Sequence, residues 1–323
     1  MDITYLILAH QNPAQLRRLV YRLLDQDVHI YIHIDRNTDI APFQQALAGL
    51  DKQVSLVGEH QRHHGSWGGL GIVRGTLAGM QQAQADGRTG TLILLSGMDY
   101  PIKSRADIRR FFQEHAGQAF MHGRSIREPF TPEHPRRLRN YAFFLCAGKG
   151  DYLLLPPVCS AECLRFLTSK RFWSIRFFKR LIRLIRQEKC RFLKPLFRKR
   201  NFPDYLEPHF GSQWWALPMA AVERVLAFIK VHPDYEQYHH FTLLPDECFF
   251  HSIVFSQAAN WGIPLHSTPL TYTRWEAVQP TSPLLLTETD YPDLIRSSCL
   301  FARKFDPEKS KNLLDRLDAL ESR

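Results

Sequence analysis

The chain has 323 residues and a formal net charge of +10, with apolar and charged fractions of 44% and 23%. This length suffices for one large α/β domain or two modest ones, and the composition excludes a disordered chain. No basic region followed by a long apolar stretch opens the sequence, and no window reaches the roughly 18 apolar residues of a spanning helix, so neither a signal peptide nor a membrane span is predicted.

The cysteines and the net charge indicate the cellular compartment and the kind of binding partner. The six cysteines are scattered, and none has zinc or redox spacing, which is typical of free thiols in a reducing compartment. We therefore expect a cytoplasmic protein. Its positive charge favours an anionic partner, for which a nucleotide-sugar, an anionic lipid, a nucleic acid and an acidic glycan all qualify.

The N-terminal part alternates short apolar runs with helical patterns. Strands are predicted at Ile3–Ala9, His29–Asp35, Val54–Val57 and Thr91–Ser96, and helices at Pro13–Leu24, Leu70–Ala85 and Ser104–Glu114. This alternation predicts an α/β fold with a mostly parallel sheet and helices on both faces. Ligands bind such sheets beyond the carboxyl ends of the strands. His10, Asp35, the glycine-rich turn 65–69 and Asp99 should therefore surround one crevice.

Residues Arg165–Arg200 differ in character, because Glu188 is their only acid and apolar side chains recur among the Lys and Arg at near-helical spacing. An amphipathic basic helix is predicted. Its basic face is either simply solvated or contacts an anionic membrane surface or a lipid-linked acceptor. Nucleic-acid binding is not favoured, since no known nucleic-acid motif accompanies the charge.

The C-terminal third contains three further helical patterns before a charged terminal helix. These are Ala220–Lys230, Cys248–Ala258 and Tyr291–Ser297, with an extended piece at Leu265–Tyr272 between the last two.

The first candidate for chemistry is Pro245-Asp246-Glu247, at the start of the second of these helices. Acids in a first helical turn commonly serve as dipole partners. Here, however, they lie between Leu243-Leu244 and Phe249-Phe250. Apolar surroundings could bury one carboxylate and raise its pKa, which would make it a better proton acceptor.

The second candidate is the pair Arg303-Lys304, with Arg274 upstream. Such cations are often plain surface residues, but Phe301 and Phe305 could anchor this loop. Anchored cations could grip a diphosphate and stabilise the charge of a leaving nucleotide. The carboxylate that follows the strand Thr91–Ser96 is the lone Asp99, not a D-x-D triplet of the kind that holds a cation in many sugar transferases. We therefore predict neither a metal site nor a cofactor.

Four tryptophans form the third candidate group, because aromatic faces stack on sugar rings. They are Trp67, Trp214, Trp215 and Trp275. Core packing is the alternative for each. Adjacent residues on an extended segment face opposite sides, so at most one of Trp214 and Trp215 is expected in the core.

Taken in order, several blocks resemble one known family over nearly the whole length of the chain. The blocks are His33-Ile34-Asp35, Ser66-Trp67-Gly68, Ser96-Gly97-Met98-Asp99-Tyr100-Pro101-Ile102-Lys103, Gly211-Ser212-Gln213-Trp214-Trp215, Pro245-Asp246-Glu247 and Leu300-Phe301-Ala302-Arg303-Lys304-Phe305-Asp306. The chain resembles the core-2/I-branching β-1,6-N-acetylglucosaminyltransferases and the related peptide O-xylosyltransferases, which form glycosyltransferase family 14.

The resemblance implies a GT-A-like, Rossmann-type fold and an inverting transfer from a UDP-sugar that needs no divalent metal. By matched position, Glu247 would be the catalytic base, and Arg274 and Lys304, helped by Arg303, would hold the diphosphate. Asp35 would lie near the uridine and Asp99 near the sugar. From their places at the crevice and among the stacking aromatics, we also expect His10 and Trp67 to contact the donor. Trp214, Trp215 and Trp275 are candidates for acceptor or donor contact, and Asp246 is a candidate for acceptor contact.

We expect no membrane anchor, stem or disulfides like those of animal members, and hence a bacterial-type member with a glycan, lipid-linked glycan or glycoprotein acceptor. We expect a single domain, 1–323, with a nucleotide-sugar half (1–150), a basic helical insert (151–205) and a catalytic half (206–323). Peripheral contact with the inner face of the membrane through 165–200 is the role considered for the insert. The donor expected is UDP-N-acetylglucosamine. UDP-xylose is the first alternative, and a non-catalytic glycan- or membrane-binding protein is the second.

Overall fold

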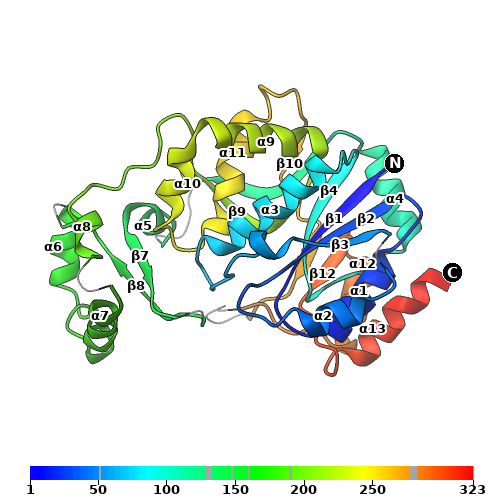
Figure 1. The fold of residues 1–323 in the computed structure, drawn as a ribbon, viewed down its shortest axis with the longest axis horizontal. Coiled ribbons are helices and arrows are strands. Elements are labelled where there is room, and N and C mark those ends of the chain that lie inside the picture. The colour runs from blue at the N-terminus through cyan, green and yellow to red at the C-terminus, as the bar shows by residue number, and fades with distance from the viewer. Residues whose placement is uncertain are drawn as a thin grey trace.

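The computed structural model describes residues 1–50, 52–128, 133–146, 148–158, 160–188, 191–276 and 282–322. A seven-stranded sheet lies at its centre (Figure 1). In spatial order the strands are β10 (Leu265–His266), β6 (Ala119–Ser125), β9 (His209–Pro218), β4 (Thr91–Ser96), β1 (Ile3–Ala9), β2 (Val28–Ile34) and β3 (Val54–Leu56). Only β9 runs antiparallel to its neighbours in this sheet, so the expectation of a mostly parallel sheet is confirmed.

Helices cover both faces of this sheet. One face packs on α1 (Pro13–Leu23), α2 (Ala41–Leu47), α4 (Arg105–Glu114) and α13 (Lys311–Asp318). The other packs on α3 (Gly71–Ala85), α9 (Met219–Val231), α10 (Pro233–His239) and α11 (Phe249–Gln257). The strand β1 contributes Tyr5 and Ile7 to the first core and Leu6 to the second, as the alternation of side chains along a strand requires.

A second, three-stranded sheet brings the C-terminal part to the end of β4. It contains β11 (Thr271–Thr273), β12 (Phe301–Arg303) and β5 (Asp99–Pro101), and β12 is antiparallel to β5 with Arg303 opposite Asp99. Phe301 and Phe305 are fully buried on either side of Arg303-Lys304, so these two aromatic side chains do anchor that segment. The remaining short elements nearby are η3 (Glu288–Asp290) and α12 (Tyr291–Arg296).

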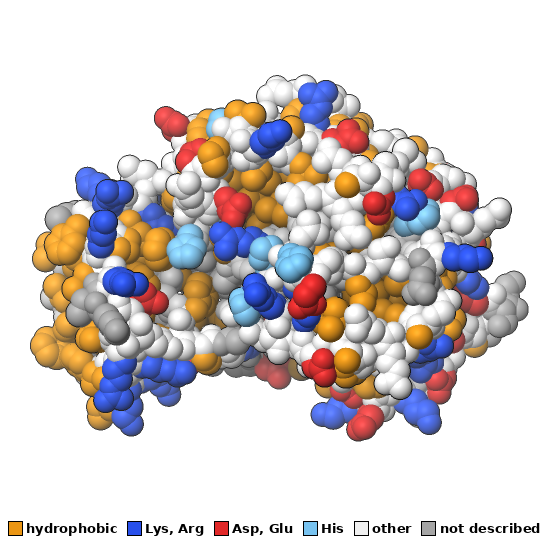
Figure 2. Space-filling model, in the orientation of Figure 1, with side chains coloured by type: hydrophobic (Ala, Val, Ile, Leu, Met, Phe, Trp, Pro, Cys, Tyr) orange, Lys and Arg blue, Asp and Glu red, His pale blue; other side chains and the backbone are white. Residues whose placement is uncertain are grey.

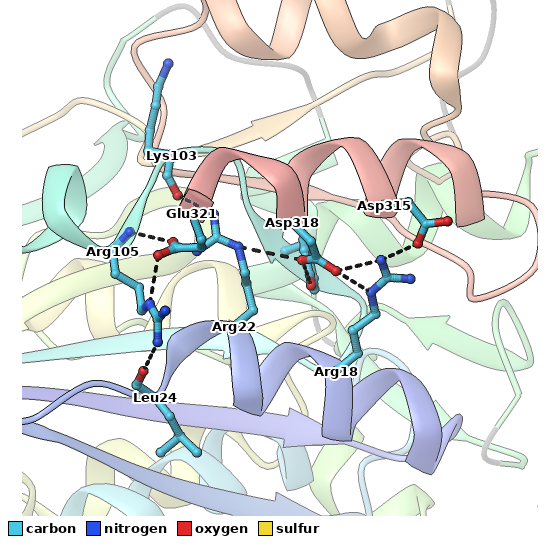
Figure 3. Close-up of polar contacts among 9 residues, drawn as sticks. Arg18, Arg22, Leu24, Lys103, Arg105, Asp315, Asp318 and Glu321 are labelled. Atoms are coloured by element: carbon cyan, nitrogen blue, oxygen red, sulfur yellow. Dashed lines mark hydrogen bonds and ion pairs between the residues drawn. The ribbon is translucent and has the colours of Figure 1, made fainter. Parts of the chain in front are cut away.

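Ion pairs fix the end of the chain to its beginning (Figure 3). From α1, Arg18 reaches Asp315 and Asp318 of α13 at 2.6 Å each. The Arg105 side chain at the start of α4 lies 2.8 Å from Glu321 in η4 (Ala319–Ser322). The C-terminal helix therefore closes over the same face as α1 and α4.

A smaller unit projects from the sheet at the left of Figure 1. It comprises α5 (Glu133–Arg139), the hairpin β7 (Tyr141–Phe144) and β8 (Tyr152–Leu155), and the helices α6 (Ala161–Leu167), α7 (Ile175–Glu188) and α8 (Leu193–Leu196). The hairpin and α7 share a separate apolar core that includes Phe143, Phe177 and Leu184. We call residues 161–199 the basic arm. Its central helix α7 confirms the predicted amphipathic basic helix.

Most predicted elements agree with the structure to within one or two residues. The helix Ser104–Glu114 begins with the Ser104 side chain accepting a hydrogen bond from the Asp107 amide, as an N-cap serine does. Two further short 3₁₀ helices are η1 (Glu59–Gln61) and η2 (Pro245–Glu247). No helix in the described part of the chain is long and apolar enough to cross a membrane.

Candidate active site

A cavity of about 1450 Å³ opens at the carboxyl ends of β1, β2 and β4. Small-molecule pockets usually measure about 300–1,000 Å³, so this cavity has room for more than one substrate. Its wall draws on residues from His10 in the N-terminal part to Lys304 near the C-terminus.

At one end of the cavity, the Asp35 carboxylate ties together two loops. Its two oxygens accept hydrogen bonds from the amides of Asn37 (2.7 Å) and Gly65 (2.6 Å). A Cβ atom on Gly65 would lie 2.4 Å from Asp35 Oδ2, so only glycine allows this close approach. The loop after β2 and the turn 65–69 are thereby held as one wall.

His10 follows β1 on the same wall. Burial lowers its pKa below 6.5, and Lys304 lowers it further while Asp35 opposes the shift. Burial therefore favours the uncharged form of the imidazole. His10 and Lys304 both line the cavity, so the C-terminal segment reaches the same cavity as the end of β1.

The turn at Trp67 meets the segment that carries the candidate base. The Leu244 amide donates to the Gly68 carbonyl at 2.8 Å, and both residues have positive φ angles, 54° and 78°. The Trp67 ring stacks on Tyr152 of β8, and Lys149 Nζ lies 5.8 Å from the centre of the Trp67 ring. Trp67 therefore lies between the main sheet and the β7–β8 hairpin.

Glu247 lies on the cavity wall and is about one-third exposed, paired with an arginine that sequence reasoning missed. Arg137 Nη1, from α5, is 2.5 Å from Glu247 Oε2. This pair fixes the orientation of the carboxylate. The hydrogen bond engages Oε2 of the carboxylate. The run Arg136-Arg137 before β7 was the available sequence signal, but 110 residues separate the partners.

Beside Glu247, Asp246 is buried within the wall. Burial, and next the neighbouring Glu247, raise the pKa of Asp246 to about 7, against the opposing effects of Arg137 and Arg303. Asp246 Oδ1 has no hydrogen-bond partner among the described residues. The apolar surroundings expected for this pair of acids thus act most strongly on Asp246.

Arg303 links three parts of the site. Its guanidinium lies 4.2 Å from the centre of the Trp214 ring, and Nε is 3.2 Å from Asp99 Oδ1. Alignment for a hydrogen bond is lacking in that ion pair, so the attraction is chiefly electrostatic. Burial raises the pKa of Asp99 to about 6, although Arg303 and the Ser96 amide act in the opposite direction.

Lys304 also faces the cavity. Its Nζ donates to Ser282 Oγ at 3.1 Å, and burial lowers its pKa, with further contributions from Arg303 and Lys149. Three cations therefore influence one region of the wall. Lys149 was missed from the sequence, where Gly148-Lys149-Gly150 resembles an ordinary turn.

The cavity brings together most of the predicted site residues. Those on its wall are His10, Asp35, Trp67, Trp214, Asp246, Glu247, Trp275, Arg303 and Lys304. Asp99, Trp215 and Arg274 are not among the lining residues. Asp99 lies fully buried behind Arg303, and Arg274 forms an ion pair with the buried carboxylate of Asp290.

The expectation that at most one of Trp214 and Trp215 is buried is wrong. Trp215 packs against Phe250 in the core, 5.5 Å between ring centres. Trp214 faces the other side of β9, as predicted, but Arg303 covers its ring, so 7% of it is exposed. By contrast, Trp275 is largely exposed. Contact of Trp215 with an acceptor is therefore excluded in this conformation.

Comparison with known proteins agrees with this geometry. The sequence profile of the family described as Core-2/I-Branching enzyme matches residues 3–134. A xylosyltransferase from Ciona intestinalis is 20% identical over 335 aligned positions, which cover 98% of this chain. The chain spans about a third (34%) of that relative's length. The N-terminal part of the chain is thus similar to the core-2/I-branching enzymes, and nearly the whole chain is distantly similar to a xylosyltransferase.

Proposed function

We propose that this protein transfers a sugar, with inversion at the anomeric carbon, from a UDP-sugar to a hydroxyl of a glycan or glycoconjugate without a divalent metal. The observation that supports this most strongly is one cavity with a carboxylate, Glu247, and the cations Arg303 and Lys304 on its wall. A general base and a charge-stabilising group are what a single displacement requires.

In the proposed reaction, Glu247 takes the proton of the acceptor hydroxyl. The acceptor oxygen then forms a bond to C1 of the donor sugar from the face opposite UDP, and the bond from C1 to the phosphate oxygen breaks. UDP leaves with the electron pair, and Lys304 and Arg303 stabilise its negative charge. Arg137 holds Glu247 in position through Oε2 during the transfer.

The resemblance suggested that Arg274 holds the diphosphate, but this proposal gives Arg274 a supporting role instead. Its ion pair with Asp290 and its position off the cavity wall favour a role in supporting the strand β11. We therefore assign the diphosphate to Lys304 and Arg303, with Lys149 as a third cation nearby.

Two donor sugars remain candidates. Family breadth supports UDP-N-acetylglucosamine, and the name of the Ciona relative, a xylosyltransferase, supports UDP-xylose. A non-catalytic protein is less well supported, because Glu247, Arg303 and Lys304 are all present on the cavity wall.

The test is the release of UDP by the purified protein from a panel of UDP-sugars, with a chelator present. We expect release from one donor, unchanged by the chelator. Glu247→Gln should lower kcat by about 10²-fold or more, the usual scale for loss of a general base, while the exposed Glu308→Gln should have no effect. Dependence on added manganese, or a fully active Glu247→Gln, would overturn the proposal.

A further inference from the structure

The helix α7 carries an apolar stripe that faces solvent in the described part of the protein. Ile175, Phe178, Ile182 and Ile185 recur at steps of three, four and three residues, so they share one face of the helix. All four are exposed, Ile175 by 75% and Ile182 by 50%. A neighbouring face, with Phe177 and Leu184, is buried against the hairpin. The helix is thus firmly packed while presenting a second apolar face to solvent.

Other large apolar side chains of the basic arm are exposed as well. Leu164, Trp173 and Phe197 are 70%, 69% and 64% exposed. The Trp173 indole donates a hydrogen bond to the Leu167 carbonyl at 3.0 Å, so this ring is held in place although it faces solvent. Soluble proteins rarely leave such apolar side chains gathered on one surface unless something binds there.

Positive charge surrounds these apolar side chains. Glu162 and Glu188 are the only acidic residues in the sequence of the basic arm, against many Lys and Arg. Figure 2 shows hydrophobic and basic side chains together at the left end of the molecule, over α6, α7 and α8. On α7 itself, Lys179 and Arg186 each directly follow an apolar residue of the stripe, and both are exposed.

We propose that the basic arm docks on an anionic lipid bilayer, with the apolar stripe in the boundary between headgroups and acyl chains and the Lys and Arg side chains on the lipid phosphates. Amphipathic helices rich in Lys and Arg bind membranes in this way. A second copy of this chain is a poorer partner, because two basic arms would repel each other.

The arm also adjoins the cavity, since Arg171 and Arg180 line it. Arg180 is fixed there by hydrogen bonding to the Gly150 carbonyl at 2.7 Å. A docked arm therefore brings the cavity close to the bilayer. The docking itself does not depend on the proposed sugar transfer.

The experiment is cosedimentation of the full chain with vesicles of phosphatidylcholine alone or mixed with an equal part of phosphatidylglycerol. We expect the chain to bind the mixed vesicles. Binding to phosphatidylcholine alone should be weaker by about tenfold or more, and salt should reduce binding to the mixed vesicles. Trp173 fluorescence should shift to the blue on binding, and this shift should be lost in Trp173→Phe. Equal binding to both vesicles, or binding to neither, would overturn the proposal.

Variants distinguish binding through the apolar stripe from nonspecific binding by other exposed apolar side chains. The double variant Ile175→Asp with Ile182→Asp should weaken vesicle binding about tenfold or more, because both side chains would have to enter the apolar boundary. The control is Val231→Asp, at an equally exposed position (73%) on α9, which should bind normally. UDP release in solution should be unchanged in the double variant and in the control. A failure of docking is therefore distinguishable from a failure of the proposed function.

Two outcomes would identify another occupant and reject the bilayer. One is a dimer of the wild-type chain that the double variant dissociates. The other is salt-sensitive retention on DNA without binding to anionic vesicles.

Discussion

Asp246 combines nearly complete burial with a carboxyl whose pKa is raised to about 7. Below pH 3.8 this group is protonated in both the folded and the unfolded chain. Between pH 3.8 and about 7 the folded chain keeps the proton that the unfolded chain loses, so the free energy of unfolding falls as pH rises through this window. Above pH 7 the full cost of the buried charge is present.

Asp246→Asn should therefore flatten the dependence of stability on pH. Relative to the wild type, the variant should gain stability from pH 4 to about pH 7 and then level off, because the amide cannot become charged. Thermal unfolding across this range is the measurement. The exposed Asp204→Asn serves as the control and should follow the wild-type curve. A constant difference between Asp246→Asn and the wild type at every pH would contradict the assigned burial effect.

Glu247 and Arg303 show how single residues gain their role from distant partners. Arg137 fixes the carboxylate of Glu247, and Arg303 lies between Asp99 and the ring of Trp214. Neither pairing follows from the local sequence. The acids and cations were nevertheless recognisable as candidates, because the sequence blocks that contain them occur together and in order.

Among the elements, Arg200 is the fixed point between the basic arm and the main body. It is buried, and its guanidinium donates hydrogen bonds to the carbonyls of Leu138 (2.9 Å), Asn140 (2.6 Å) and Tyr238 (2.8 Å). It also lies 4.3 Å from the centre of the Tyr238 ring. One side chain thus joins the arm to α5, to the start of β7 and to α10.

Arg200→Met should lower the free energy of unfolding by about 2–3 kcal/mol, because buried carbonyl oxygens lose a charged donor. Urea unfolding measures this change. Lys199→Met, at the adjacent exposed position, should stay within about 0.5 kcal/mol of the wild type. If both variants were equally stable, Arg200 would not be the anchor of the arm.

The place and direction of strand β9 in the sheet could not be predicted from the sequence. The segment was expected to be extended, but not to lie between β4 and β6 and antiparallel to both. A Cβ atom on Gly211 would lie 1.9 Å from the His122 carbonyl oxygen, so the two backbones approach closely beside the bulge in β6. Such a pairing depends on residues about 90 positions away.

At the scale of the whole molecule, the cavity is assembled from both ends of the chain. A nucleotide that binds there should stabilise the complete fold, by about 2.7 kcal/mol at a concentration 100 times its Kd. We expect UDP to raise the melting temperature equally with chelator or with manganese, because in the proposed function Arg303 and Lys304 supply the positive charge. A shift that required manganese would contradict this.

Lys304→Met provides the matching variant for that measurement. The UDP-induced shift should become smaller, since the diphosphate would lose one of its cations. Lys309→Met, an exposed lysine five positions further along, should retain the full shift. An undiminished shift in Lys304→Met would contradict the assignment of the diphosphate to this part of the cavity.

The sequence by itself determined the class of fold, the order of most strands and helices, the amphipathic basic helix and the residues Glu247, Arg303 and Lys304 as candidates. These follow from local periodicity and from blocks of adjacent residues. Only the tertiary structure decided that Arg137 pairs with Glu247, that Trp214 and Trp215 are both buried, and that Arg274 is engaged by Asp290. The physical reason is that burial and ion pairing depend on contacts between segments far apart in the chain, and no local pattern encodes which distant side chain arrives.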